Sequence, residues 1–149
     1  MSDCIFCKIA SHEIPSTVVY EDDTVIAFDD LSPQAPVHTL VIPKEHYENI
    51  IDGVPADVLA AMVHAVGEVA KAKGLDDGFR VITNKGANAG QTVMHFHMHV
   101  LGGKDLGEGL VEHDAPRARA RAAPRAVSRY DNHVGQMVRG TAAQAKGVP

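Results

Sequence analysis

The chain has 149 residues, of which 45% are hydrophobic and 22% charged, and its formal net charge is −5. This size and composition are typical of one compact domain with its own core, and no run of about 18 apolar residues marks a membrane span. The N-terminus lacks a basic start followed by an apolar run, so we expect no secretory signal and a cytoplasmic protein.

Short strand-like runs separated by turns occupy the first third of the chain. Residues 17–20 and 24–28 are rich in β-branched and aromatic side chains and flank an acidic turn, so they predict a hairpin. Residues 32–36 contain two prolines, which cannot take part in ladder pairing, and are expected to form a loop. Residues 39–42 predict a third strand, which Pro43 ends.

One helix is predicted from Pro55, a residue favoured in the first helical turn, to Gly74 as the C-terminal cap. Its apolar residues recur at helical spacing and form one face: Val58, Leu59, Met62, Val63, Val66, Val69 and Ala70. Residues 79–83 and 93–101 predict the last two strands, joined by a Gly- and Asn-rich loop at 84–90. The sequence therefore predicts an α+β domain, with an antiparallel sheet of about five strands and one long helix on one face.

Charge is divided unevenly along the chain. Residues 1–103 hold six Lys or Arg against 14 Asp or Glu, a net charge of −8, whereas residues 104–149 carry +3. An acidic body argues against nucleic acid as the main partner, but a small nucleotide is compatible because backbone N–H groups can bind its phosphate. We expect a domain at 1–103 and a partly helical or mobile extension at 104–149; a basic tail contacting RNA or a membrane is the alternative.

Three histidines alternate with apolar residues in His95-Phe96-His97-Met98-His99. Because successive side chains of a strand point to opposite faces, the three imidazoles are expected on one face, about 6.5–7 Å apart. Imidazole acts as acid, base or nucleophile near neutral pH, so such a face can divide those roles. A metal-binding patch and an accidental polar face are the alternatives, and the Gly-rich loop before the motif, which can bind an anion, favours catalysis.

Cys4 and Cys7 form a C-x-x-C motif. A structural disulfide is not expected in a reducing cytosol, which leaves a metal half-site or a redox pair. Redox pairs of this spacing usually lie at the start of a helix in a thioredoxin-like pattern, and the sequence contains no such pattern.

Together these motifs resemble the histidine triad (HIT) family. The resemblance is carried by an H-φ-H-φ-H-φ-φ signature at 95–101, where φ is apolar, by Gly90-Gln91-Thr92-Val93, Leu101-Gly102-Gly103 and Val41-Ile42-Pro43-Lys44, and by residues 30–38. It runs from about Cys4 to Gly103 and is strongest to the zinc-binding bacterial type of the Hint branch. It implies a HIT-like fold with a short N-terminal helix, and a homodimer.

The resemblance implies a role for each member of the histidine cluster. His97 would attack the α-phosphorus of a nucleotide and form a nucleotidyl-histidine, while its other ring nitrogen donates to a backbone carbonyl. His99 would face the phosphate and the leaving group. His38 would complete the cluster, or serve as a hydrogen-bonded structural histidine. Thr92 would direct its hydroxyl toward the phosphate or the leaving group.

The resemblance also implies a nucleotide pocket. Asp30 would accept from the ribose hydroxyls, and Asn84 would contact ribose and phosphate. The base pocket would be lined by side chains that the residues alone predict as core: Phe6, Ile26 and Phe28. The phosphate would lie on a loop made of Gly90, Gln91, Thr92 and Val93. Asp29, where Hint relatives often have histidine, would add negative charge beside this pocket.

Bacterial members of this type bind zinc with two cysteines and two histidines, which in this chain correspond to Cys4, Cys7, His46 and His95. A Cys2His2 set suits a closed, tetrahedral structural site, here tying the N-terminus to the histidine segment. His95 would then serve the metal and leave catalysis to His97 and His99.

The function implied is hydrolysis of purine nucleoside phosphoramidates, with AMP as a product. The alternative among enzymes is a dinucleoside polyphosphate hydrolase. The alternative outside enzymes is a zinc-stabilised nucleotide-binding protein with little turnover.

Overall fold

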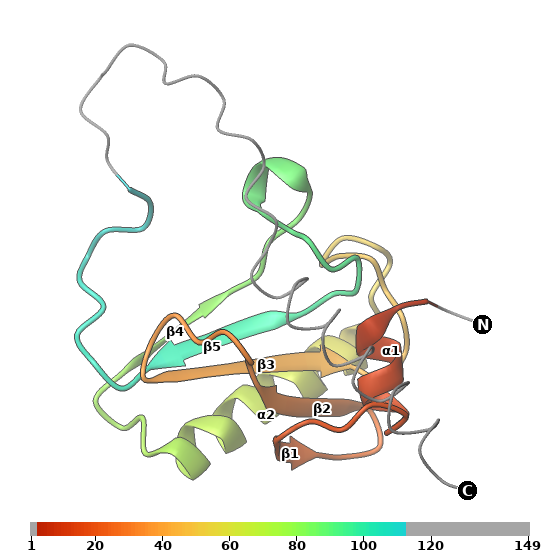
Figure 1. The fold of residues 1–149 in the computed structure, drawn as a ribbon, viewed down its shortest axis with the longest axis horizontal. Coiled ribbons are helices and arrows are strands. Elements are labelled where there is room, and N and C mark those ends of the chain that lie inside the picture. Colours follow the sequence, from red (N-terminus) through yellow and green to blue (C-terminus); the bar gives the residue numbers. More distant parts are fainter. Residues whose placement is uncertain (1–2, 113–149) are drawn as a thin grey trace, which may run out of the picture.

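The structure, a computed structural model, describes residues 3–112 of the chain. Its elements are α1 (Ile5–Ala10), β1 (Val18–Glu21), β2 (Val25–Asp29), β3 (Val37–Pro43), α2 (Ala56–Lys73), β4 (Phe79–Ile82), the 3-10 helix η1 (Ala87–Ala89) and β5 (Met98–Gly102) (Figure 1). Most of the extension predicted at 104–149 lies outside the described residues. Within them, no helix is long and apolar enough to cross a bilayer.

The five strands form one antiparallel sheet in the order β1-β2-β3-β5-β4, as the α+β prediction required. β1 and β2 form the predicted hairpin, whose turn is closed by Asp22: its carboxylate accepts from the N–H groups of Thr24 and Val25 at 2.8 and 2.9 Å. β3 is longer than predicted at both ends and includes Pro43 as its last residue, where a missing N–H interrupts no internal ladder bond.

The long helix α2 covers one face of the sheet, over β1, β2 and β3 (Figure 1). Its buried residues, among them Met62, Ala65 and Val69, pack in a core cluster that also contains Val41 and Val100. The predicted cap is confirmed: Gly74 ends the helix with a left-handed backbone, φ 66°. Two details of the prediction are wrong, because Pro55 precedes the first turn as the N-cap, and Val63 is 63% exposed.

The short helix α1 covers the opposite face, which confirms the short N-terminal helix. Phe6 and Ile9 are its most buried residues, and they pack on side chains of β2 and β3 in a second core cluster. The two faces follow from strand alternation, since Val25 and Ala27 belong to the α2 cluster and Ile26 to the α1 cluster. The sheet is therefore a central layer with a helix on each side.

The fifth strand is shorter than the predicted 93–101, so His95 and His97 precede it rather than lie in it. Continued beyond Val41 and Met98, the register would place Ile42 opposite His97 and then Pro43, which has no N–H, opposite Phe96. The Pro43 carbonyl instead faces the His95 ring at 2.8 Å. The N–H of Phe96 donates to the Tyr47 carbonyl at 2.6 Å, outside the sheet. Even so, apolar residues still alternate toward the α2 core, as the predicted strand required.

Candidate functional site

Three imidazoles gather on the α1 face of the sheet, where β3 pairs with β5. His38 lies in β3, His99 in β5, and His97 just before β5. The ring centroid of His99 is 5.1 Å from that of His38 and 5.0 Å from that of His97. The structure thus brings together the three histidines predicted for catalysis, while the His95 ring is directed to the metal cluster described below.

His97 is held at its ring and at its main chain. Its Nδ1 lies 2.6 Å from the carbonyl oxygen of His95, and its own carbonyl accepts from the Thr83 hydroxyl at 2.7 Å. The ring meets the Phe6 ring edge to face, with centroids 5.1 Å apart. Since a carbonyl only accepts, Nδ1 carries the proton of a neutral ring, and the lone pair of Nε2 is left for chemistry.

A chain of hydrogen bonds sets where His38 and His99 carry their protons. The backbone N–H of Gln34 donates to His38 Nδ1 at 3.1 Å, so the proton of a neutral His38 is on Nε2. That nitrogen lies 2.9 Å from His99 Nδ1 and 3.4 Å from an oxygen of Asp30, both acceptors. His99 therefore accepts at Nδ1 and presents its own N–H at Nε2.

Burial keeps this cluster uncharged at neutral pH. It lowers the pKa of His97, against the opposing effect of the hydrogen bond to the His95 carbonyl. It also lowers the pKa of His38, against the opposing charge of Asp30. For His99, burial together with repulsion from His97 and His38 lowers the pKa to about 3. Neutral imidazoles offer an anionic substrate both an N–H donor and a nucleophilic lone pair.

The predicted phosphate loop is tied down chiefly by Gln91, whose side chain is 4% exposed. Its Oε1 accepts from the N–H of Gly86 at 2.9 Å, and its Nε2 donates to the carbonyls of Glu48 and Val93 at 2.6 and 3.1 Å. The structure therefore places the Gln91 amide in loop-to-loop contacts. The side chain therefore holds the loop in shape, and a part of Gln91 in cradling phosphate stays a prediction.

The rest of the loop divides into a closed and an open part. The N–H groups of Gly90 and Gln91 are used within the turn, donating to Ala87 and Gly86. Thr92 is exposed, and within the described residues its hydroxyl and N–H make no hydrogen bond. An anion at this loop would thus meet Thr92 and the residue after it, Val93.

The apolar residues predicted for the base pocket are core residues in this structure. Phe6, Ile26 and Phe28 are each 1% exposed or less and belong to the cluster beneath α1, which Val93 also contacts. Asn84 is half-buried and directly follows Thr83, the residue that binds the His97 carbonyl. A part in nucleotide binding stays a prediction for these side chains.

The expectation for Asp29 is wrong. As adjacent residues at the end of β2, Asp29 and Asp30 point to opposite faces. Asp29 lies on the α2 face, where it binds the Lys73 ammonium and the Thr39 hydroxyl, each at 2.9 Å. Its charge is therefore paired on the far side of the sheet from the histidines, and only Asp30 faces them.

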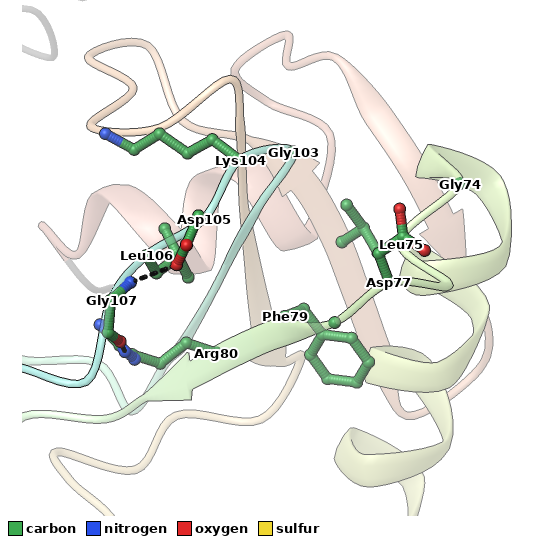
Figure 2. Close-up of a pocket in the computed structure, with 11 residues that line it drawn as sticks. Gly74, Leu75, Asp77, Phe79, Arg80, Gly103, Lys104, Asp105, Leu106 and Gly107 are labelled. Carbon is green, nitrogen blue, oxygen red and sulfur yellow. Dashed lines mark hydrogen bonds between the residues drawn. The ribbon is translucent and has the colours of Figure 1, made fainter.

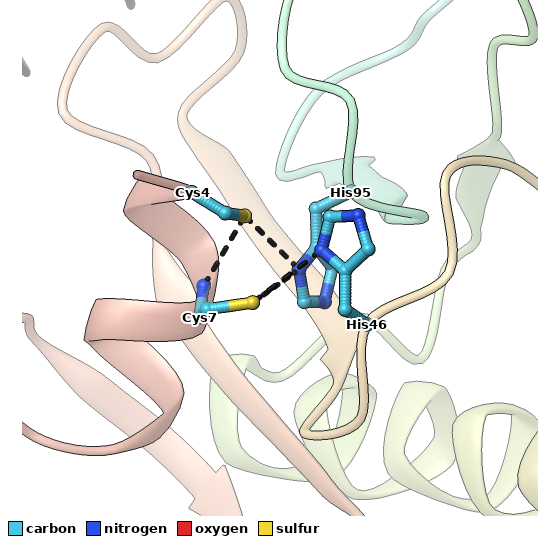
Figure 3. A group of neighbouring side chains, drawn as sticks. All are labelled: Cys4, Cys7, His46 and His95. Carbon is cyan, nitrogen blue, oxygen red and sulfur yellow. Dashed lines mark hydrogen bonds between the residues drawn. The ribbon is translucent and has the colours of Figure 1, made fainter. Parts of the chain in front are cut away.

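Cys4, Cys7, His46 and His95 converge in one cluster, the four predicted metal ligands (Figure 3). Their ligand atoms all lie within 4.8 Å of one another. Cys4 Sγ is 3.3 Å from His95 Nδ1, and Cys7 Sγ is 3.4 Å from His46 Nδ1. Two sulfurs and two imidazole nitrogens at these separations fit the tetrahedral donor set that zinc prefers.

The metal cluster also has outer support. The other nitrogen of His95 lies 2.8 Å from the Pro43 carbonyl, so it is the protonated one and Nδ1 is free to bind a metal. Burial lowers the pKa of His95 to about 4, which keeps this ring neutral and able to ligate. The cluster can therefore hold a metal ion.

Comparison with known proteins decides the family. A family model described as HIT domain matches residues 11–106, more than half of the chain. The chain belongs to the HIT family. The 14 kDa zinc-binding protein of Brassica juncea is 46% identical over 113 residues, covering 70% of this chain and 96% of the relative. The adenylylsulfatase HINT1 of Arabidopsis thaliana is 44% identical over 114 residues, covering 70% of this chain and 74% of the relative.

Solved structures agree with the HIT assignment. A HIT family hydrolase from Clostridium thermocellum superposes with a TM-score of 0.71 at 47% identity, over 74% of this chain and 99% of that one. The predicted HIT-like fold is therefore confirmed.

Two contacts that hold the HIT histidines were not predicted from the sequence. Thr83 could have been noticed as a hydroxyl at the end of a strand that pairs with the histidine segment. The contact from Gln34 comes from its backbone N–H, which leaves no signal in residue type.

A hollow of about 610 Å³ lies elsewhere, between the end of α2, the start of β4 and residues 103–107 (Figure 2). Phe79 in its wall begins β4 and pairs with Gly102, whereas the other end of β4 pairs with His99. None of the predicted site residues lines it.

Proposed function

We propose that this HIT protein hydrolyses purine nucleoside phosphoramidates through a nucleotide covalently bound to His97. One observation carries the proposal: the 2.6 Å contact between His97 Nδ1 and the His95 carbonyl. It leaves Nε2 unprotonated and directed away from the main chain, as a nucleophile requires.

In the first step, the lone pair of His97 Nε2 attacks the α-phosphorus and the P–N bond breaks. The leaving amine needs a proton, which the protonated form of His99 supplies from Nε2. An anionic phosphate beside His99 favours the protonated ring, because a nearby opposite charge stabilises the charged form. Substrate binding would therefore lead His99 to take up the proton that the leaving amine later receives.

In the second step, water attacks the same phosphorus and the bond to His97 breaks. The water gives one proton back to His99, and the nucleoside monophosphate leaves. In the net reaction, water cleaves the P–N bond, its oxygen stays on the phosphate, and the amine leaves. Both histidines return to their starting state. Thr92 and Val93 would bind the phosphate oxygens through N–H and hydroxyl donors.

For the nucleoside, the proposal assigns the ribose to Asp30. One oxygen of Asp30 accepts from the Ser32 N–H at 2.7 Å, which holds the carboxylate in position on the histidine face. An adenine base is favoured by the relative named as an adenylylsulfatase. We also assign zinc to the Cys4, Cys7, His46 and His95 cluster; when bound there, it crosslinks α1 to the segment before β5.

Release of AMP from adenosine phosphoramidate tests this proposal, with diadenosine polyphosphate assayed in parallel. We expect wild type to cleave the phosphoramidate, and His97→Ala to lose at least about a thousandfold in kcat, as when a nucleophile is removed. His64→Ala is the control, since His64 is an exposed histidine of α2. Cleavage of the dinucleotide alone would favour the polyphosphate hydrolase. Tight binding of AMP without any cleavage would favour a binding protein.

A further inference from the structure

We propose that the metal cluster holds the nucleophile in place, and that His95 is the positioning residue linking metal occupancy to turnover. The inference rests on the proposed role of His97. It assigns the cluster a part in catalysis without contact between the metal and the substrate.

The first observation is that His95 belongs to both sites. Its ring nitrogen Nδ1 lies 3.3 Å from Cys4 Sγ and 3.5 Å from Cys7 Sγ, within the metal cluster. Its carbonyl oxygen lies 2.6 Å from His97 Nδ1. A shift of the His95 main chain therefore moves the acceptor that orients the nucleophile.

The second observation is that ladder pairing in the sheet does not extend to this segment. β5 begins at Met98, so His95 and His97 lie outside the ladder. The Thr83 hydroxyl holds the carbonyl of His97, but it does not set the rotation of the ring. The contact that sets the ring is the one to His95. The peptide that carries this carbonyl is held by the Phe96 N–H, which donates to the Tyr47 carbonyl at 2.6 Å, and by the fully buried His95 side chain, whose ring lies between the Pro43 carbonyl and the metal cluster.

The third observation is that α1 carries a second link. Phe6 lies between the two cysteines in the chain. Its ring centroid is 5.9 Å from that of His95 and 5.1 Å from that of His97. A helix of six residues is not stable alone, so α1 depends on its core contacts and on the crosslink at its start. Without that crosslink, Phe6 is held less firmly against the nucleophile.

The size of the effect follows from the geometric demand of the reaction. A misplacement of about 1 Å can cost roughly a hundredfold in rate, while substrate binding is less sensitive. We therefore expect metal loss to lower kcat at least tenfold and to change KM less than threefold.

The test is the His46→Ala variant, since the His46 ring contacts Cys7 and His95, and no contact joins it to His97 within the described residues. Zinc content is measured by atomic emission, folding by circular dichroism, and the His97 ring by ¹⁵N–¹H NMR. We expect the zinc-depleted variant to stay folded, to lose the single Nδ1–H form of His97 and to lose kcat. Excess zinc should restore both the Nδ1–H form of His97 and kcat. His12→Gln is the control, because it alters the loop after α1 without touching the cluster.

A folded, zinc-depleted protein with unchanged kcat and an unchanged His97 signal would overturn the proposal. If His46→Ala fails to fold, the test is made on wild type with cadmium in place of zinc. The longer bonds of cadmium to sulfur should shift the His97 resonances and alter kcat. No change in either quantity would also overturn the proposal. If wild type shows no phosphoramidate cleavage, the proposed function fails. The dependence of the His97 signal on metal then still tests the coupling by itself.

Discussion

At the scale of single residues, Asp29 and Asp30 show how strand alternation separates two adjacent carboxylates. Asp29 forms an ion pair with Lys73 and accepts from Thr39 on the α2 face. Asp30 lies 3.4 Å from His38 on the other face. One carboxylate therefore belongs to the fold and the other to the site, although the sequence presents them as a pair.

Replacing each carboxylate by its amide should separate the two roles. Asp29→Asn should lower the free energy of unfolding by about 1 kcal/mol, as for a partly exposed ion pair, and leave KM unchanged. Asp30→Asn should raise KM for the nucleotide roughly tenfold, because hydrogen bonds to a charged group contribute about 1.5–3 kcal/mol. Urea unfolding and steady-state kinetics on both variants measure this. A raised KM in Asp29→Asn would contradict the assignment.

The histidine roles illustrate what residue patterns could and could not predict. Alternation predicted that His97 and His99 share a face, and the four metal ligands came together as the resemblance implied. The resemblance placed Gln91 beside the phosphate, and only the fold shows that three loop contacts occupy its side-chain amide. Polar side chains in loops have many partners within reach, so their residue type alone does not select one.

At the scale of elements, the pairing of β3 with β5 places the buried His38 beside the half-buried His99. Burial and its neighbours lower the pKa of His99 to about 3, below the ordinary value of 6.5. The unfolded chain therefore binds a proton at His99 between pH 6.5 and 3, and the folded chain does not. The contribution of the neutral His99 to the free energy of unfolding should accordingly be fully present above pH 6.5 and be lost as the pH is lowered through that window.

The slope of the free energy of unfolding between pH 7.5 and 5.5 tests this, with zinc content checked at each pH. We expect wild type to lose stability toward pH 5.5, at up to about 1.4 kcal/mol per pH unit for one such group. His99→Gln should show a shallower slope, whereas His64→Gln, which removes an exposed histidine, should keep the wild-type slope. Equal slopes for all three proteins would contradict a neutral, half-buried His99.

The element boundaries were predictable where local rules dominate. The hairpin, Gly74 and the period of α2 follow from turn chemistry and spacing, and all three are confirmed. The start of β5 was not predictable, because it depends on the partner strand β3, whose pairing with this segment ends at Val41, far away in the chain. Strand length is a property of a pair, so one strand's composition does not determine it.

At the scale of the whole molecule, β4 is an apolar edge that no other described helix or strand covers. Phe79 and Val81 are 43% and 41% exposed, at the end of the sheet order. Val81 pairs with Val100, a residue of the α2 core, so these side chains lie on the α2 face, beyond the strands that α2 chiefly covers. An edge with free backbone groups and apolar side chains invites another strand. We therefore propose β4 as the site of the homodimer that the family resemblance implies.

A charge placed in this edge should prevent the association. We expect wild type to sediment as a dimer at micromolar concentration and Val81→Lys as a folded monomer, because joining two edges would bury the ammonium without a partner. Ile51→Lys is the matched control: this side chain is 75% exposed in the loop before α2, so the dimer should persist. A wild-type monomer would refute the dimer itself. A dimeric Val81→Lys would place the interface on another face, since a buried lysine at a strand-to-strand contact costs more than the contact gains.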